Sequence, residues 1–361
     1  MKLRSVISML LVLCLLAGLS ACAKAPAPAP SSAPAAEPAK KPETVEFTDD
    51  TGRTLTLPGE ITKIAVTGPM SQIVLFSLAP DMLAGISNKW DPGAEDYFEA
   101  KYFNLPVLGQ LYGGKGELNL EELLKAKPQL VLDVGEAKKG VGEDLDALSS
   151  QTGIPFVHID AATGTMGEAY RKLGALLGLT DRAEELAAYC EDTWAMAEKI
   201  MADVGDRKVK LLYLLGDEGL NVIAAGSYHA EIIDFLGDNL AVLDDPSSKG
   251  TGNETDMEQL LLWDPEFIIF AHDSVAERVG SDPTWQQLKA IKEGKYAEVP
   301  YGPYNWMGFP PSVQRYLGIL WIMKTIYPDQ ADYDLRAEVD RYFNLFYHCT
   351  LTDAQYASIV G

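Results

Sequence analysis

The side chains best suited to chemistry in this sequence follow short apolar runs that predict β-strands. They are Met70, Ser71, Trp90, Tyr112, Lys115 and Glu136 in the first half of the chain, and Tyr228, His229, His272, Tyr304, Asn305 and Trp306 in the second. In open α/β sheets, ligands bind beyond the carboxyl ends of the strands. Aromatic faces there suit a flat or bulky ligand, and Lys115 would meet an anionic group. We therefore expect these residues to bind a ligand, although any single aromatic ring could instead pack beneath a loop.

The same residues do not predict a catalytic site or a resident cofactor. The sequence contains no Gly-x-Ser-x-Gly elbow, no phosphate-binding loop and no His-Glu-x-x-His motif. Glu136, His272 and Asp273 could in principle form an acid–base set, but the strand ends of any α/β fold offer such residues by chance. We therefore expect a binding protein rather than an enzyme.

A bare metal ion is the alternative ligand. His229 and His272 are the only two of the 4 histidines that follow predicted strands, and a closed metal site needs about four ligands. We therefore expect no metal site built by the protein alone.

The first residues predict export and lipid attachment. Lys2 and Arg4 precede an apolar run at residues 6–16, and Leu19-Ser20-Ala21-Cys22 resembles the lipobox of bacterial lipoproteins. We expect residues 1–21 to be a signal peptide and Cys22 to carry the lipid that anchors the protein outside the cytoplasm, at the cell membrane. Residues 22–43 are rich in alanine and proline, which predicts an extended tether with a reach on the order of 60 Å.

Charge and cysteine content narrow the possible partners. The formal net charge is -22 over 361 residues, and such a surface repels nucleic acid. Of the 4 cysteines, Cys14 and Cys22 belong to the predicted leader and lipid site, which leaves Cys190 and Cys349. Export permits a disulfide between them, but nothing in the sequence brings them together, so we expect two free thiols.

Strands and helices alternate in two groups on either side of a helical middle. Apolar runs predict strands at residues 64–66, 83–86, 129–134 and 155–159, and then at 209–216, 222–226 and 266–270. Predicted helices cover residues 70–78, 166–177, 181–204, 229–236 and 311–326. This alternation favours an α/β fold with parallel sheets. We expect an N-terminal lobe at residues 44–165, a linker helix region at 166–204 and a C-terminal lobe at 205–361.

The longest predicted helix lies in the middle of the chain. Asp181 and Glu184 have the spacing of a capping box, and an apolar stripe continues to about residue 204. Strand patterns resume beyond it, which indicates a helix that crosses between the lobes rather than a plain core helix.

One segment of the first lobe is repeated in the second. Residues 119–132 and 256–269 share an acidic residue, paired leucines, a proline and an apolar strand at the same offsets. Glu121 and Glu258 are equivalent, 137 residues apart (258 − 121). Each copy predicts a short helix that is stopped by the proline and leads into a strand. Such a repeat indicates a duplicated α/β lobe.

With these features, the chain resembles the substrate-binding proteins of ABC importers for iron–siderophore complexes, haem and cobalamin. The resemblance covers nearly everything after Val45 and includes the opening at residues 50–53, the repeated segment, residues 283–290 and residues 311–318. It implies two Rossmann-like lobes with parallel-rich sheets, joined by a single long α-helix, with the ligand in the cleft between them. The implied ligand is a small-molecule metal chelate: a siderophore complex, haem or a corrinoid.

The resemblance also implies a membrane partner. In this family one glutamate on each lobe docks to a permease dimer that works with a cytoplasmic ATPase, and Glu121 and Glu258 occupy the matching positions. The alternative is that each is a helix-start carboxylate favoured by the helix dipole. Because none of the predicted cleft loops contains an arginine, an oxyanion remains open as the ligand beside the chelates. A sensory receptor that signals to a membrane protein remains the other functional alternative.

Overall fold

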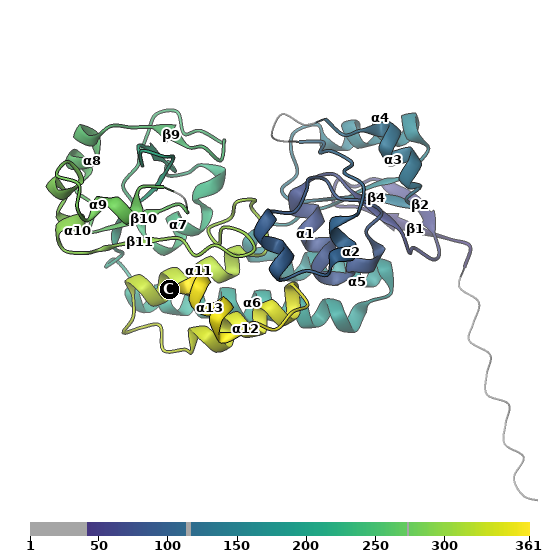
Figure 1. The fold of residues 1–361 in the computed structure, drawn as a ribbon. Helices are drawn as coiled ribbons and strands as arrows, with labels where there is room; N and C mark the ends of the chain where they lie inside the picture. The colour runs from purple at the N-terminus through teal and green to yellow at the C-terminus, as the bar shows by residue number, and fades with distance from the viewer. Residues whose placement is uncertain (1–41, 113–116, 273) are drawn as a thin grey trace, which may run out of the picture. The chain divides into compact units, whose positions relative to one another are not determined.

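The computed structural model describes residues 42–112, 117–272 and 274–361 (Figure 1). Residues Lys41–Gly361 form one compact unit. The predicted signal peptide, the predicted lipid site Cys22 and most of the tether lie outside the described residues, as does Lys115. No helix in the described part is long and apolar enough to span a membrane.

The N-terminal lobe is built around a three-stranded parallel sheet. Its strands are β3 (Ile64–Val66), β4 (Leu130–Val134) and β5 (Phe156–Ile159), in the order β3-β4-β5. Every residue of these strands is buried, as expected for strands covered on both faces. The helices of this lobe are α1 (Pro69–Leu78), α2 (Ala100–Phe103), α3 (Leu120–Ala126) and α4 (Val141–Thr152). A separate antiparallel hairpin, β1 (Thr44–Thr48) and β2 (Thr54–Pro58), precedes them.

The C-terminal lobe contains a mixed sheet. Strands β6 (Lys210–Leu215), β10 (Phe267–Phe270) and β11 (Tyr296–Glu298) are parallel, and β8 (Asp238–Asn239) also pairs in parallel with β6. Short strands β7 (Asn221–Val222) and β9 (Asn253–Glu254) extend the sheet in antiparallel fashion. The helices of this lobe are α7 (Glu231–Leu236), α8 (Met257–Trp263), α9 (Ala276–Val279), α10 (Lys289–Lys292) and α11 (Arg315–Ile326).

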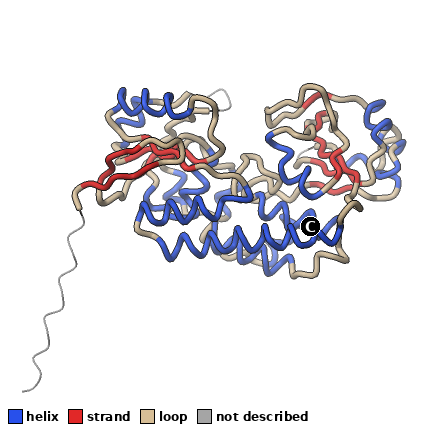
Figure 2. Tube along the Cα trace, turned by 180° about the vertical axis from the view of Figure 1, so that it is seen from behind, coloured by secondary structure: helices blue, strands red, loops and turns tan. Residues whose placement is uncertain are grey.

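A long helix runs beneath both lobes. Helix α6 (Thr180–Val204) has 25 residues and packs against α1 and α5 (Met166–Leu177) as well as α11 and α12 (Leu335–Phe346) (Figures 1 and 2). Its length is roughly 37 Å at 1.5 Å per residue. The predicted fold class, α/β lobes with parallel-rich sheets joined by one long helix, is confirmed. The lobe boundaries at residues 165 and 204 stay a prediction.

The predicted capping box at the start of α6 is wrong. The helix begins at Thr180, and no side chain caps its first turn. The Glu184 carboxylate instead accepts hydrogen bonds from Arg171 of α5, at 2.7 and 2.8 Å. This ion pair between adjacent helices draws Glu184 away from the backbone N–H group that a capping box would satisfy.

The repeated segment has the same local structure in both lobes. The Asn119 side chain caps α3 by accepting from the backbone N–H of Glu122, and Asp256 caps α8 in the same way through Gln259. Both helices end in a left-handed residue, Lys127 at φ 50° and Asp264 at φ 45°. A proline follows each, and then the strand. The two copies therefore present equivalent helix surfaces.

Three other predicted elements are shorter than expected. Residues 83–86 form only isolated bridges, through Leu83 and Ile86, and the strand predicted at residues 222–226 stops at Val222. The last predicted helix begins at Arg315 rather than residue 311. Prolines at 310 and 311 lack the N–H that a helix requires, and i+3 turns bridge from Ser312 into α11.

The end of the chain packs onto its beginning. Nε2 of His348, just after α12, donates a hydrogen bond of 3.0 Å to the backbone oxygen of Phe76 in α1. Arg182 of α6 donates to the backbone oxygen of Leu345 in α12. Helix α13 (Asp353–Val360) follows, and its Gln355 donates to the backbone oxygen of Asp96. Residues of both lobes therefore share one hydrophobic core with the helices beneath them.

Candidate functional site

A cavity of about 1030 Å³ is lined by both lobes. The N-terminal lobe contributes the end of β4, the residues that follow β3 and β4, and a separate loop: Thr67, Gly68, Pro69, Met70, Ser71, Gln110, Tyr112, Asp133, Val134, Gly135, Glu136, Ala137, Lys138 and Val141. The C-terminal lobe contributes Tyr228, His229, Ser248, Lys249, Gly250, Thr251, Pro310 and Pro311. The residues after β3 and β4 follow from the rule that ligands bind beyond the carboxyl ends of parallel strands, whereas the C-terminal set comes from loops next to short antiparallel strands and α11.

Polar groups fix the wall of the cavity formed by the N-terminal lobe. Asp133, near the end of β4, accepts hydrogen bonds from the hydroxyl of Thr67 and shares a 2.7 Å hydrogen bond with Nδ1 of the buried His158. The Ser71 hydroxyl accepts from the backbone N–H of Val134 at 2.8 Å. These bonds hold one carboxylate in place at the surface of an otherwise buried sheet, where it can accept from a ligand.

An aromatic ring and a lysine form the next part of this wall. The ammonium of Lys138 lies 4.2 Å from the centroid of the Tyr112 ring, and the Tyr112 hydroxyl donates to Asp144 at 3.1 Å. Burial lowers the pKa of Lys138, and burial together with the hydrogen bond to Asp144 raises the pKa of Tyr112. Among the described residues Lys138 forms no ion pair, and the Tyr112 ring and the more distant charge of Asp133 stabilise its ammonium beside the cavity.

The wall formed by the C-terminal lobe carries an imidazole and a second aromatic ring. His229 stacks on Phe309, with ring centroids 4.8 Å apart and planes 7° apart, and it also contacts Tyr228. Burial is the main reason why the pKa of His229 is lowered to about 4. Nδ1 of this ring is buried and has no hydrogen-bond partner among the described residues. His229 is therefore neutral at physiological pH, and the stacking fixes its orientation.

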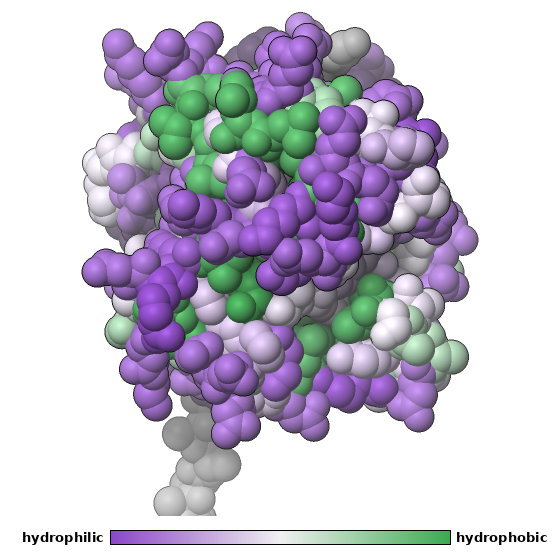
Figure 3. Space-filling model, turned by 90° about the vertical axis from the view of Figure 1, so that its left-hand side faces the viewer, coloured by the Kyte–Doolittle hydropathy of each residue, from purple (hydrophilic) through white to green (hydrophobic). Residues whose placement is uncertain are grey.

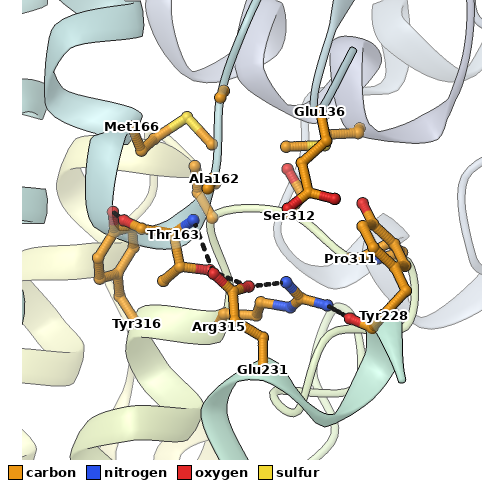
Figure 4. A pocket seen from close by; sticks show the side chains of 13 residues that line it. Glu136, Ala162, Thr163, Met166, Tyr228, Glu231, Pro311, Ser312, Arg315 and Tyr316 are labelled. Carbon is orange, nitrogen blue, oxygen red and sulfur yellow. Dashed lines mark hydrogen bonds and ion pairs between the residues drawn. The ribbon is translucent and has the colours of Figure 1, made fainter. Parts of the chain in front are cut away.

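A partly buried ion pair forms the floor between the lobes (Figure 4). Glu231, the first residue of α7, accepts from the backbone N–H and the hydroxyl of Thr163, at 3.2 and 2.6 Å, and from the guanidinium of Arg315. Arg315 also donates to the backbone oxygen of Tyr228 at 3.2 Å, and Tyr316 donates to the backbone oxygen of Thr163 at 2.5 Å. This network connects residues just after β5 to α7 and α11.

The floor encloses a second, narrow cavity of about 10 Å³ that shares Met70, Glu136, Tyr228 and Pro311 with the large one. Figure 4 shows Glu136 and Ser312 facing this space above the ion pair. The Ser312 hydroxyl and Nε of Arg315 are buried and lack hydrogen-bond partners among the described residues. The floor therefore offers unpaired donors next to the ligand cavity.

The structure places the sequence-predicted site residues in two groups. Six of them line the large cavity: Met70, Ser71, Tyr112, Glu136, Tyr228 and His229. Five others do not: Trp90, His272, Tyr304, Asn305 and Trp306.

The five residues outside the cavity lining contact other residues of the fold. Trp90 packs against Phe76 in the core and donates from Nε1 to the backbone oxygen of Tyr102, at 3.0 Å. Trp306 is fully buried and donates to the oxygen of Gly302, also through its ring nitrogen.

The remaining three of these residues have partners of their own. Tyr304 is buried in the core, and Asn305 donates to the hydroxyl of Tyr213 at 3.2 Å. His272 stacks on Tyr301 with centroids 4.4 Å apart and pairs with Glu298 at 2.9 Å. These three side chains therefore contact other residues of the fold and do not line the large cavity.

Sequence reasoning missed most of the charged groups near the cavity. Lys138 and Lys249 lie in polar loops with no distinguishing motif. The one available signal was a glycine within a few residues of each lysine in the sequence. Arg315 and Glu231 lie at the starts of helices, so a search restricted to loops excluded them. None of the predicted cleft loops contains an arginine, but Arg315, at the start of α11, lies next to the large cavity.

Two other features that could carry chemistry are the cysteines and any group of side chains that could bind a metal ion. Cys190 and Cys349 are free thiols, as predicted. Within the described residues, no group of three or more His, Cys, Asp or Glu side chains is placed to hold a metal ion.

The docking candidates lie away from the cavity. Glu121 and Glu258 are the second residues of α3 and α8, and both are exposed. They occupy equivalent positions on the repeated helices, as the sequence predicted. Their role in docking remains a prediction.

Comparison with known proteins identifies what shares this architecture. Residues 64–301 match the family model described as periplasmic binding protein. An ABC transporter solute-binding protein from Sulfurospirillum deleyianum is 26% identical, with a TM-score of 0.80 over 87% of this chain and 98% of its own. No curated protein sequence matches the chain.

More distant structures share the fold alone. The molybdate-bound periplasmic binding protein MolA of Haemophilus influenzae is 19% identical, with a TM-score of 0.65 over 85% of this chain and 99% of its own. The catecholate-siderophore binding protein VctP of Vibrio cholerae is 20% identical, with a TM-score of 0.55 over 77% and 99%. One scaffold therefore accommodates ligands of very different size.

Proposed function

The chain belongs to the periplasmic binding protein family, and from that premise we propose that it captures a metal chelate outside the cytoplasm and delivers it to the permease of an ABC importer. The chelate class comprises siderophore complexes of iron, haem and corrinoids. The observation that carries this proposal is the cavity of about 1030 Å³ lined by both lobes. Its volume lies at the upper end of the range of roughly 300–1,000 Å³ for pockets that hold drug-sized molecules.

The size of the cavity favours a chelate over a bare ion or an oxyanion. A small oxyanion fills only a few times the ~30 Å³ of a water molecule. Such a ligand would leave most of the cavity to solvent and would touch only one wall. A chelate several times larger reaches both Tyr112 and Tyr228, one on each lobe.

The chemistry of the walls favours a ligand with anionic groups around an apolar or aromatic body. Lys138 and Lys249 line the cavity, one in each lobe; no carboxylate lines the C-terminal wall beside Lys249, whereas Asp133 and Glu136 lie on the same wall as Lys138. The rings of Tyr112 and Tyr228 supply flat apolar surfaces beside them. The ferric tris-catecholate complex and the propionate groups of haem carry the negative charge that the lysines would neutralise.

We further propose that Cys22 carries a lipid that holds the protein at the membrane. The Leu-Ser-Ala-Cys motif and the alanine- and proline-rich tether support this proposal. Substitution Cys22→Ser should release the protein from the membrane fraction, and intact-mass measurement of the membrane-bound form should show a diacylglycerol adduct. A Cys22→Ser protein that still fractionates with membranes would refute the lipid anchor.

Ligand identity is tested with the compact unit, residues 41–361. Haem, cobalamin, a ferric tris-catecholate, a ferric hydroxamate, molybdate and Ni²⁺ are each added, and thermal shift and calorimetry measure binding. A ligand at a hundred times its dissociation constant stabilises the protein by about 2.7 kcal/mol, which a thermal shift resolves. Binding of molybdate or Ni²⁺ with no binding of any chelate would refute the proposal.

A matched pair of variants locates the site. Tyr112→Ala removes the ring beneath Lys138 and should weaken chelate binding. Tyr356→Ala removes a ring that pairs with Arg336 at 4.7 Å on α13, away from the cavity lining, and should leave binding unchanged. Equal effects of the two substitutions would show that the ligand binds elsewhere.

A further inference from the structure

Large apolar side chains are exposed at only a few places in the described part of the chain. Tyr228 lines the cavity, and the others are Val107, Leu124, Val242, Leu261 and Leu262. Three of these five lie on α3 and α8, the helices of the repeated segment. Figure 3 shows the side of the molecule that carries α8, where apolar residues gather in a patch with hydrophilic residues around it.

Leu124 and Leu261 occupy the same position in the two copies. They lie 137 residues apart (261 − 124), as Glu121 and Glu258 do, and each follows its glutamate by three residues. Residues three apart lie on one helix face, so each lobe presents a carboxylate next to a leucine. The leucine side chains are 48% and 38% exposed.

The same partial exposure therefore occurs at the same position in both lobes. Full burial of a leucine is worth about 1.5–3 kcal/mol, and part of that gain is forgone at both leucines. Figure 1 draws α3 and α8 at the ends of their lobes that lie away from α6. A partner with two similar recesses would cover both leucines at once, and a permease of two related subunits has that arrangement.

The two copies differ at the next residue. On α3 the ammonium of Lys125 lies 2.8 Å from the carboxylate of Glu121, and this contact raises the pKa of Lys125. The equivalent position on α8 is Leu262, which is 78% exposed. Glu258 has no ion-pair partner among the described residues. The α8 face is therefore more apolar and carries the less compensated carboxylate.

Resting on the proposed function, we propose that Leu124 and Leu261 are apolar contacts in the docking of this protein to its permease, and that the α8 face binds the permease more strongly than the α3 face. Each leucine enters an apolar recess next to a basic side chain of one permease subunit. On α3, Lys125 must move away from Glu121 and repels that basic side chain. On α8, Leu262 adds buried apolar surface and leaves Glu258 free to pair.

The proposal is tested by measuring the affinity of residues 41–361 for the permease–ATPase complex of the importer in lipid nanodiscs. Leu124→Gln and Leu261→Gln remove the apolar contacts and keep good helix formers on exposed helix faces. Leu262→Lys gives α8 the residue found on α3, and Lys125→Leu gives α3 the residue found on α8. Leu261→Met retains an apolar side chain of similar volume and serves as the conservative control.

We expect each leucine-to-glutamine substitution to weaken binding at least tenfold and Leu261→Met to leave it within threefold. Leu262→Lys should weaken binding and make it less sensitive to salt, because the added lysine offsets the charge of Glu258, whereas Lys125→Leu should tighten it. Thermal shift with the chelate identified above should be the same for all variants, because the cavity is untouched.

Three results would overturn the inference. If Glu121→Lys and Glu258→Lys abolish binding and the leucine variants bind normally, docking is purely electrostatic and only the proposed function stands. If sedimentation shows a dimer of this chain that Leu261→Gln dissociates, the occupant is a second copy. If the unsubstituted protein binds a chelate but never the permease, transport itself is wrong and the docking surface with it.

Discussion

Replacement of Glu231 by glutamine tests the ion pair at the floor of the cavity. The Arg315 side chain is only 6% exposed and Glu231 is 30% exposed, so the substitution leaves a buried guanidinium without its counter-ion. Removal of one partner of a buried pair costs about 3–5 kcal/mol. Because water reaches Glu231, we expect the lower value, about 3 kcal/mol, which lowers the melting temperature by roughly 6 °C.

Replacement of the other partner of the ion pair, Arg315, should cost less stability. Arg315→Met leaves Glu231 with water and with both hydrogen bonds from Thr163, so we expect a loss of about 1–2 kcal/mol from packing and from the contact with Tyr228. The double variant has neither charge and should lose about 2 kcal/mol. The coupling energy between the two positions is then about 2–3 kcal/mol.

Urea unfolding followed by circular dichroism and tryptophan fluorescence measures all three variants without ligand. Coincident transitions from the two probes are needed before free energies are compared. A cost below about 1 kcal/mol for Glu231→Gln, or costs that simply add in the double variant, would refute the view that this pair is buried and mutually dependent.

Three further predictions concern titration, ring contacts and a thiol. Since the pKa of His229 is about 4 when folded, against 6.5 ordinarily, the unfolded chain takes up a proton first and stability should fall as pH drops from 6.5 to about 4; melting curves of His229→Phe should show a smaller decline, because His348, whose pKa burial also lowers, still contributes, and an identical decline in both proteins would contradict the assignment. Tyr112→Phe keeps the ring beneath Lys138 and should change chelate affinity in calorimetry less than threefold, so a loss as large as that of Tyr112→Ala would show that the hydroxyl matters. Burial raises the pKa of the Cys190 thiol, so iodoacetamide should modify it only after unfolding, as mass spectrometry would detect; rapid modification of the native protein would mean that the helix packing is loose.

Most of the fold could be predicted because its signals are local. Apolar runs at residues 64–66, 130–134 and 267–270 become buried parallel strands, and the repeated segment predicted two helices that share caps and stop residues. The errors lie where long-range contacts overrule a local preference. Glu184 forms an ion pair with Arg171 instead of capping its own helix.

The candidate site could be predicted only in part. The rule that ligands bind beyond strand ends found Tyr112, Tyr228 and His229, but it also selected Trp90, whose loop folds back onto the core. The floor depends on Arg315 meeting Glu231, 84 positions earlier in the chain, and on Tyr316 meeting Thr163, 153 positions earlier. No sequence spacing encodes such a meeting, so only the three-dimensional structure places an arginine there.

The contact between His348 and the backbone of Phe76 spans 272 residues and has a consequence for how the polypeptide matures. The first lobe obtains some of its packing partners from α12 and from His348 just after it. Contacts of such long sequence separation form slowly, because a large loop must close first. A chain without α12 and His348 therefore lacks part of the core on which the first lobe packs.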